Sequence, residues 1–598
     1  MIIFLQYPFD LKKLETLKNQ NIITFDHKSH KILLQHNIVH KQSEEFLNDE
    51  DFDVIENKCH EWAQWFNQEK IREIVTYNKI NLGSLYIWEF YYYLIPIIKK
   101  IIEIEKISEK INESECVCSS FLEDIAKNHF KVTKLFDKIK EDNSLLFDNV
   151  KWNLTNNLEI NIKKENFEKM KKISEKVLLN FSRLNQNKDD NEKSILFVEF
   201  DPIKYENLYS KISDTKIKPI FFNYRRPYFW DIRSFKIINQ TGGEIITDRG
   251  DFSHDDQKNF IYKKIYALNE IYFQRHFSIN DRSYWNIIKK DFFKIFNRKI
   301  EDGIKIIHVG EKLIQNKKID EIIIWSENGF SEQVIIKLGK KMNIPISLIQ
   351  HGIIVDNDSA RNNRFNRFSG VIPTESDKYL VWNKSTLNYI NSLGFSNENI
   401  IQIGNPSFDT ISTNKKYLEN DYILLTTTGP RKSQHAGYNS RLLDNYEYQL
   451  SLMCKKIKEQ NKKLIVRPHP FSKEFKIDQI VTDSYPEAKI DKKTDINILI
   501  KNSKVVICYG ISTIIYDAQI QEKPVFFINT EHDILGIPKY VKNNPKLMIK
   551  FDEIGNYISK IYSDLEYNNQ IINNNSNIVS NDFFNLGNSS EKFLKMYE

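Results

Sequence analysis

The sequence has 598 residues and a mass of 71.1 kDa, which is too large for one hydrophobic core and predicts two or three domains. Its net charge of +6 results from 86 basic and 80 acidic residues, so the surface is highly charged but mixed. This balance argues against a dedicated nucleic-acid-binding protein, which concentrates basic residues on one face. The five scattered cysteines argue against a disulfide framework and favour a cytoplasmic location.

The first 190 residues begin with MIIFLQYPFD, which predicts a core strand because neither a basic segment nor a cleavage site of a signal peptide accompanies it. The aromatic and apolar stretch from Tyr86 to Ile104 is interrupted by charges and Pro96, so we expect a buried helix rather than a membrane span. The polar run NQNKDDNEKS then predicts a linker. Whether residues 1–190 form a separate subdomain stays open.

After about Ser194, short β-rich runs alternate with amphipathic stretches, which predicts parallel sheets with helices on both faces. The strands of a first Rossmann-like unit are expected at SILFVEF, KPIFFNY, EIIIW and ISLIQ. A second series runs through KYLVWN, NIIQIG, YILLTTT, KLIVRPHP, KVVICYG and KPVFFIN. We place the boundary near residue 375, which gives an N-terminal domain of residues 1–375 and a C-terminal domain of residues 376–598. Two such units would face each other across a cleft.

The asparagine-rich tract NNQIINNNSNIVSN lies near the carboxyl end, between two predicted helices. Its low complexity and polarity predict a surface loop.

The last third carries two motifs suited to binding a phosphate. Arg467 and His469 follow the strand LIV, and the flanking prolines restrict where the imidazole can point. The segment GIST then places Gly510, Ser512 and Thr513 at a predicted helix start, where hydroxyl groups and unpaired N–H groups can hold an anion. A turn histidine and simple helix capping are the structural alternatives.

Further candidates lie around these motifs. Asp517 is placed one helical turn after GIST, where it could accept hydrogen bonds from a ribose or remain a solvated helix charge. The loop GPRKSQHAG offers Gly429 for close backbone approach and Arg431 for charge, and could cover a diphosphate or be a solvated connection.

In the first unit, Glu327 and His351 each follow a predicted strand, facing the expected cleft. Either could act as the base that takes a proton from an acceptor hydroxyl. Glu327 could instead cap the following helix, and His351 could be hydrogen-bonded in a tight turn. Arg225 and Arg226, after the strand KPIFF, could face a negatively charged acceptor at the cleft rim or stack on neighbouring aromatic rings.

The region from Glu321 to Asn529 resembles GT-B glycosyltransferases of surface and capsular polysaccharide biosynthesis. The resemblance rests on the ordered motifs SENGF, IPISLIQHG, IIQIGNPSFD, RPHP and STIIYDAQIQEKPV. Capsule-type ulosonic-acid transferases and teichoic-acid glycerophosphotransferases share this order. The implied fold is α/β, with two Rossmann-like domains and an N-terminal elaboration.

The resemblance also implies roles for particular residues. It assigns the phosphate of the donor nucleotide to Arg467, His469, Ser512 and Thr513. An acidic residue before glycine is the base in ulosonic-acid transferases, which matches Glu327, although Asn328 departs from their usual second acidic residue. A histidine in an HG turn plays that part in glycerophosphotransferases, which matches His351.

We therefore expect an inverting, metal-independent glycosyltransferase with a nucleotide-sugar substrate and no cofactor. The resemblance favours a CMP-ulosonic acid donor and a glycan or lipid-linked glycan acceptor, which leaves peripheral association with the inner face of the cell membrane open. The alternatives are a sugar-nucleotide 2-epimerase of the same fold, a CDP-polyol phosphotransferase and a non-catalytic glycan-binding scaffold.

Overall fold

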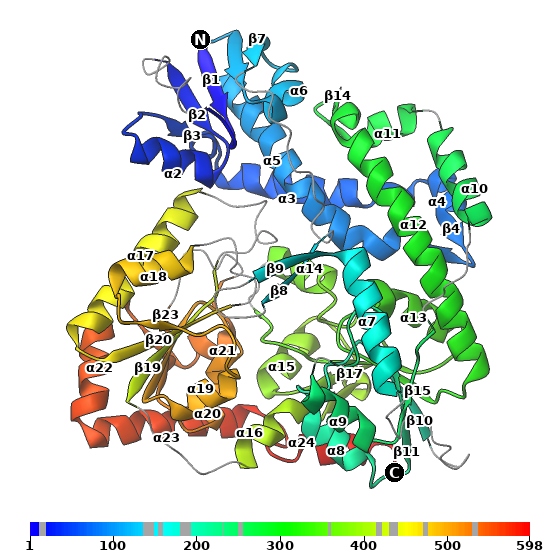
Figure 1. Cartoon of the computed structure of the whole chain (residues 1–598), viewed down its shortest axis with the longest axis vertical. Coiled ribbons are helices and arrows are strands. Elements are labelled where there is room, and N and C mark those ends of the chain that lie inside the picture. Colours follow the sequence, from blue (N-terminus) through cyan, green and yellow to red (C-terminus); the bar gives the residue numbers. More distant parts are fainter. Residues whose placement is uncertain are drawn as a thin grey trace. The chain divides into compact units, whose positions relative to one another are not determined.

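The chain forms two compact units, one composed of Met1–Asn149, His254–Ile304 and Pro430–Tyr448, and the other of Val150–Ser253, Lys305–Gly429 and Gln449–Glu598. We refer to them as the N-terminal unit and the two-sheet unit. The computed structural model describes residues 1–10, 20–135, 149–153, 159–179, 193–229, 231–248, 255–268, 270–356, 360–413, 421–429, 440–469, 476–528 and 536–598 (Figure 1).

The N-terminal unit contains a five-stranded parallel sheet in the order β3-β2-β1-β6-β7. Its strands are β1 (Ile2–Leu5), β2 (Asn21–Thr24), β3 (Lys41–Gln42), β6 (Glu115–Cys118) and β7 (Lys131–Leu135). Helix α2 (His27–Gln35) buries Leu33 against Ile3 and Leu5 of the first strand. The predicted opening strand is therefore confirmed, and it lies at the centre of its own sheet.

The aromatic stretch forms helix α5 (Ile87–Lys110), as predicted, with Pro96 inside it. One of its lysines, Lys99, is buried and lies 2.7 Å from the carboxylate of Glu44, which compensates the charge inside the protein. Across the described part of the chain, no helix has the length and apolar character needed to cross a membrane.

The first sheet of the two-sheet unit has seven parallel strands in the order β12-β11-β10-β15-β16-β17-β18. The strands are β10 (Lys193–Val198), β11 (Ile217–Phe222), β12 (Glu244–Ile245), β15 (Glu321–Ile324), β16 (Ile346–Ile349), β17 (Lys378–Val381) and β18 (Ile400–Gln402). The four strands predicted for the first unit are confirmed, because runs of apolar residues fit a sheet that is covered on both faces.

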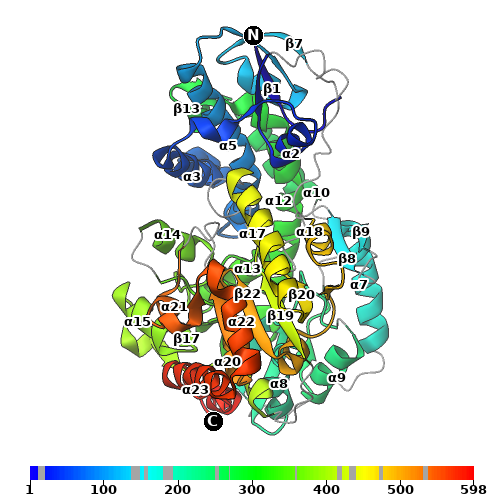
Figure 2. The same ribbon diagram turned by 90° about the vertical axis from the view of Figure 1, so that its left-hand side faces the viewer.

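The second sheet has six parallel strands in the order β21-β20-β19-β22-β23-β24. The strands are β19 (Tyr422–Thr427), β20 (Lys463–Pro468), β21 (Lys489–Ile490), β22 (Val505–Tyr509), β23 (Val525–Ile528) and β24 (Met548–Ile549). Its helices include α17 (Ser440–Glu459), α18 (Ile477–Ser484), α19 (Ile496–Asn502), α20 (Ile514–Ile520) and α22 (Ile554–Ser563) (Figure 2). Tyr557 of α22 packs against Phe526 of β23.

The structure corrects the predicted domain boundary. Residue 375 precedes β17 and β18, but these two strands continue the first sheet by pairing alongside β16, so the second sheet begins only at β19. The segment PTESD lies in the connection between β16 and β17, which are neighbouring strands of the first sheet. Residues 1–149 belong to a compact unit that also contains His254–Ile304 and Pro430–Tyr448.

The asparagine-rich tract is also corrected, because it forms part of helix α23 (Leu565–Asp582) rather than a loop. Its buried residues are Asn568, Ile571, Asn575 and Val579, whose spacing of three or four places them on one helix face. The chain then returns to the first sheet, where helix α24 (Ser589–Leu594) packs on α8 (Glu206–Ile212) (Figure 1). Two parallel α/β layers tied by a returning carboxyl-terminal segment confirm the predicted fold class.

Candidate active site

A cleft of about 520 Å³ lies within the two-sheet unit, and we call it the intersheet cleft. Loops that follow strands of the first sheet supply Lys204 and His351, while α20 and the residue before it supply Asp517 and Thr513. Ligands of open parallel sheets bind beyond the carboxyl ends of the strands, and β10 and β16 end beside this cleft. Three residues predicted from the sequence, His351, Thr513 and Asp517, are therefore brought together.

Lys204 is a cation that lines the cleft. Its Nζ lies 3.4 Å from the carbonyl oxygen of His351, and it forms no ion pair with any described residue. The side chain contacts solvent in the cleft, yet nearby protein atoms desolvate the amine and lower its pKa, against the opposing effect of Asp517. The amine can therefore bind an anionic ligand in the cleft.

Arg226 is a second cation that acts on His351, although it is not among the residues that line the cleft. Its Cζ lies 4.2 Å from the centre of the Trp325 ring, and its guanidinium approaches the carbonyl oxygen of Glu199 at 3.5 Å. Burial and the neighbouring Arg225 lower its pKa. Arg225, in contrast, forms an ion pair, because its Nη2 lies 2.7 and 2.9 Å from the two carboxylate oxygens of Glu332. Arg226 therefore stacks on an aromatic ring, which was one of its two predicted roles. Its guanidinium forms no ion pair with a carboxylate among the described residues.

His351 lies edge-on to Trp325, with the ring centres 4.9 Å apart and the planes at 88°. Burial, followed by the charges of Lys204 and Arg226, lowers its pKa to about 3, so the imidazole is neutral at physiological pH. A bound anion that offset the two cations would raise this pKa again.

Asp517 supplies an acceptor on the opposite side of the cleft. Its carboxylate forms no hydrogen bond or ion pair with another described residue. Burial raises its pKa to about 7; Lys204 lowers it and Asp495 raises it further. The cleft therefore presents a carboxylate that titrates near neutral pH and has free lone pairs.

Glu327 occupies a different environment. Its carboxylate is 4% exposed and accepts hydrogen bonds from three backbone N–H groups and two hydroxyl groups of the loop formed by Thr374, Glu375 and Ser376. It is not among the residues that line the intersheet cleft. The carboxylate therefore fixes a loop, which is a structural role but not the predicted cap of the following helix.

The remaining donor-side residues lie at the strand ends of the second sheet. Nη1 of Arg467 donates to the carbonyl oxygen of Asp491 at 3.1 Å and lies 3.7 Å from its carboxylate. The N–H of His469 donates to Thr427, which aligns the ends of β20 and β19. Ser512 accepts a hydrogen bond from the N–H of Ile514 at 3.3 Å, as expected for a residue at a helix start.

Two residues of the loop after β19, Gly429 and Arg431, were predicted to contact the donor. Gly429 is buried, whereas Arg431 lies outside the described residues. Neither Arg467 nor His469 is among the residues that line the intersheet cleft.

Gly510 is required by close backbone packing. Its φ is +98°, and a Cβ atom there would lie 1.9 Å from Oγ1 of Thr428. We expect Gly510→Ala to lower the free energy of unfolding by at least about 1–3 kcal/mol, because the backbone strain adds to the clash. Urea unfolding checks this, with Gly352→Ala as the control, since a Cβ atom at Gly352 meets nothing within 4 Å. Equal stability of both variants would contradict it.

The two parallel sheets and the cleft at their strand ends define a protein of the GT-B type. Residues 375–536 match the model of a family described as LIC12162 family transferase. None of the curated proteins matches the sequence.

Solved structures with a similar chain course include S. aureus MnaA solved with UDP, at 13% identity and a TM-score of 0.42, covering 67% of this chain and 95% of that chain. Another is UDP-GlcNAc 2-epimerase from Neisseria meningitidis bound to UDP-GlcNAc, at 12% identity and a TM-score of 0.41, covering 67% and 99%. A third is Acinetobacter baumannii MurG, at 8% identity and a TM-score of 0.34, where the match covers 68% of this chain and 99% of that chain.

Proposed function

We propose that this protein is an inverting glycosyltransferase that moves a sugar from a nucleotide-activated donor to a cell-surface glycan. The observation that carries the proposal is the intersheet cleft, which is lined by both Lys204 and Asp517. Among the described residues, Lys204 forms no ion pair and the carboxylate of Asp517 forms no hydrogen bond. A nucleotide sugar satisfies both, since its phosphates are anionic and its ribose hydroxyls donate hydrogen bonds. The partial match to a transferase family model supports the same class of reaction.

The donor is proposed to lie with its ribose at Asp517 and its phosphates between Thr513 and Lys204. Thr513 immediately precedes α20, where its hydroxyl can reach a phosphate oxygen. Of the residues that the resemblance assigns to the donor, Ser512 adjoins this position, while Arg467 and His469 are candidates for contacts further along the nucleotide. Gly510 and Gly429 would allow close backbone approach.

In the proposed reaction, the acceptor hydroxyl attacks the anomeric carbon, the bond to the donor phosphate breaks, and the hydroxyl proton passes to a base. His351 is the better placed of the two predicted bases, because it lines the cleft. Its pKa is held down partly by Lys204 and Arg226, so an anionic donor would offset both charges and strengthen the base. Lys204 would then stabilise the leaving phosphate without a metal ion.

The donor and acceptor follow from the resemblance to capsule-type transferases. A CMP-ulosonic acid is the preferred donor, and a glycan or lipid-linked glycan is the preferred acceptor. The positive charge of Arg226, which forms no ion pair with a described residue, suits an acidic substrate.

We expect nucleotide affinity to increase as the pH rises from 6 to 8. Asp517 has a pKa of about 7, and its ionised form is the stronger acceptor for ribose hydroxyls. Calorimetric titrations with CMP and UDP across this range check the trend. Asp517→Asn should bind more weakly at pH 8 and lose the pH dependence. A variant that kept the wild-type slope would exclude Asp517 as its source.

The activity can be tested by incubating the protein with CMP-, UDP- and GDP-activated sugars, with and without a capsular glycan. A glycosyltransferase releases free nucleotide only when the acceptor is present. Conversion of the donor to another sugar nucleotide without an acceptor would identify an epimerase. Glycan binding without any turnover would identify a scaffold.

A further inference from the structure

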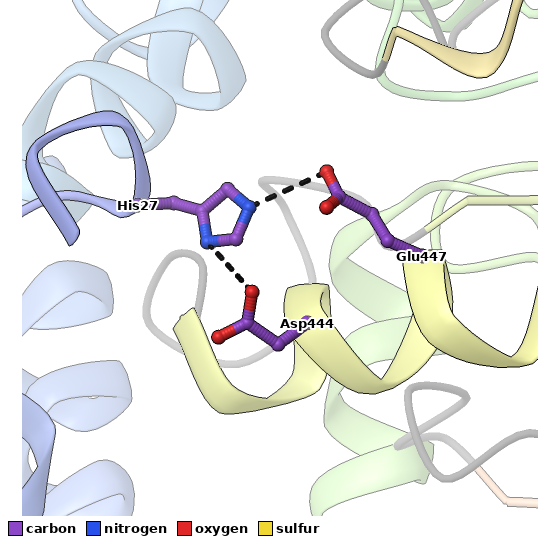
Figure 3. Close-up of side chains that lie close together, drawn as sticks. All are labelled: His27, Asp444 and Glu447. Carbon is purple, nitrogen blue, oxygen red and sulfur yellow. Dashed lines mark hydrogen bonds and ion pairs between the residues drawn. The ribbon is translucent and has the colours of Figure 1, made fainter. Parts of the chain in front are cut away.

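A cluster of histidines and carboxylates lies in the N-terminal unit and includes none of the residues of the candidate active site. His27 of α2 lies between Asp444 and Glu447 of α17 (Figure 3). One ligand atom from each of the three residues can be chosen so that all three lie within 4.8 Å of one another. The first turns of α17 belong to the same compact unit as α2, so the chain brings together side chains more than 400 positions apart.

The cluster has a regular pattern on two helices. His27 and His30 are three residues apart on α2, and Asp444 and Glu447 are three residues apart on α17, so each pair shares a helix face. Nε2 of His30 lies 2.7 Å from Oδ2 of Asp444, and Nε2 of His27 lies 3.4 Å from Oε1 of Glu447. Two imidazoles therefore face two carboxylates.

The ring of His30 is held by two neighbouring side chains. Nδ1 of His40 lies 2.8 Å from the carbonyl oxygen of Ile38, and Nε2 of His40 lies 2.8 Å from Nδ1 of His30. Nε2 of Gln42 lies 3.1 Å from each nitrogen of the His30 ring. These contacts leave Nε2 of His30 facing the carboxylate of Asp444.

The neighbouring cation does not complete the charge balance. Lys31 lies 3.1 Å from Asp444 and 3.0 Å from Glu447, so one ammonium group faces two carboxylates. Its side chain is 40% exposed and can rotate into solvent. The ring of His30, in turn, is fixed by His40 through its other nitrogen, as is usual for histidines that bind metals.

We propose that His27, His30, Asp444 and Glu447 form a binding site for a divalent transition-metal ion. Two imidazole nitrogens and two carboxylate oxygens suit Zn²⁺ and its first-row neighbours. The ion replaces Lys31 as the counter-charge of the carboxylates and joins α2 to the start of α17. This site is independent of the proposed glycosyl transfer, which uses other residues.

The test is a calorimetric titration of the EDTA-treated, dialysed full-length protein with ZnCl₂ at neutral pH. We expect one saturable equivalent and a loss of affinity of about 10-fold or more in His27→Ala and Glu447→Gln, since each removes a ligand. Lys31→Met should bind Zn²⁺ more tightly, because it removes the competing ammonium group. The control His36→Ala changes an exposed histidine at the end of the same helix and should bind like the wild type.

Absence of saturable binding in both the wild type and Lys31→Met would overturn the proposal. Unchanged binding in His27→Ala and Glu447→Gln would overturn it as well. Lys31→Met keeps every proposed ligand, so its expected gain in Zn²⁺ affinity can be measured even if His27→Ala or Glu447→Gln fails to fold. The five cysteines are buried and unchanged in all variants, so they do not affect the comparison.

Discussion

Lys204→Met is expected to weaken the binding of CMP or UDP by about 10- to 100-fold, the range for losing a charge-assisted hydrogen bond to a phosphate. The methionine keeps most of the apolar part of the side chain and removes the ammonium group. Lys204 forms no ion pair with a described residue and donates to one carbonyl oxygen, so we expect its removal to affect ligand binding more than the stability of the fold. Calorimetric titration measures the change in affinity.

The stability of the same variant distinguishes this account from a structural one. Lys204 is exposed in the cleft, and its hydrogen bond to a described residue goes to one carbonyl oxygen, so the free energy of unfolding should stay nearly equal. Lys216→Met, at an exposed position before β11, is the matched control and should change neither quantity. Reduced stability of Lys204→Met together with unchanged nucleotide affinity would assign Lys204 a structural role.

Glu327→Ala is expected to lower the free energy of unfolding by about 3–5 kcal/mol, the range for breaking a buried, charge-assisted network. The carboxylate accepts from the N–H groups of Thr374, Glu375 and Ser376, and these donors would be left buried without a partner. The connection between α14 (Ala360–Phe368) and β17 would lose its anchor. Urea unfolding followed by circular dichroism measures this loss.

The outcome also decides between the two predicted bases. Glu398→Ala, at an exposed position, is the control and should unfold like the wild type. If Glu327→Ala kept the stability of the wild type, bound nucleotide normally and lost turnover, Glu327 would be the base, as the resemblance implies. A less stable variant whose remaining folded fraction still turns over would leave His351 as the base.

The fold could be predicted from the sequence to the extent that it depends on local patterns. Apolar runs such as SILFVEF and YILLTTT allowed the central strands to be identified, because a sheet covered on both faces buries every residue of such a run. The boundary could not be predicted, since β17 looks the same whether it continues one sheet or starts another. The helix α23 was missed because Asn568 and Asn575 are buried, which only tertiary packing determines.

The candidate site could be predicted only in part. His351, Thr513 and Asp517 were identified because each lies just beyond a strand or at a helix start, the positions that surround a ligand in parallel sheets. Lys204 was missed, although its position shortly after the strand SILFVEF is the same kind of signal. The pairing of α2 with α17 has no counterpart in local sequence, because it joins segments more than 400 residues apart.

The most direct test of the central claim is a crystal structure of the protein with bound CMP or UDP. We predict that the nucleotide occupies the intersheet cleft, with a ribose hydroxyl within hydrogen-bond distance of Asp517 and a phosphate oxygen within reach of Lys204 and Thr513. A nucleotide ordered elsewhere, for example against Arg467 and His469 with the cleft empty, would contradict the proposed donor site.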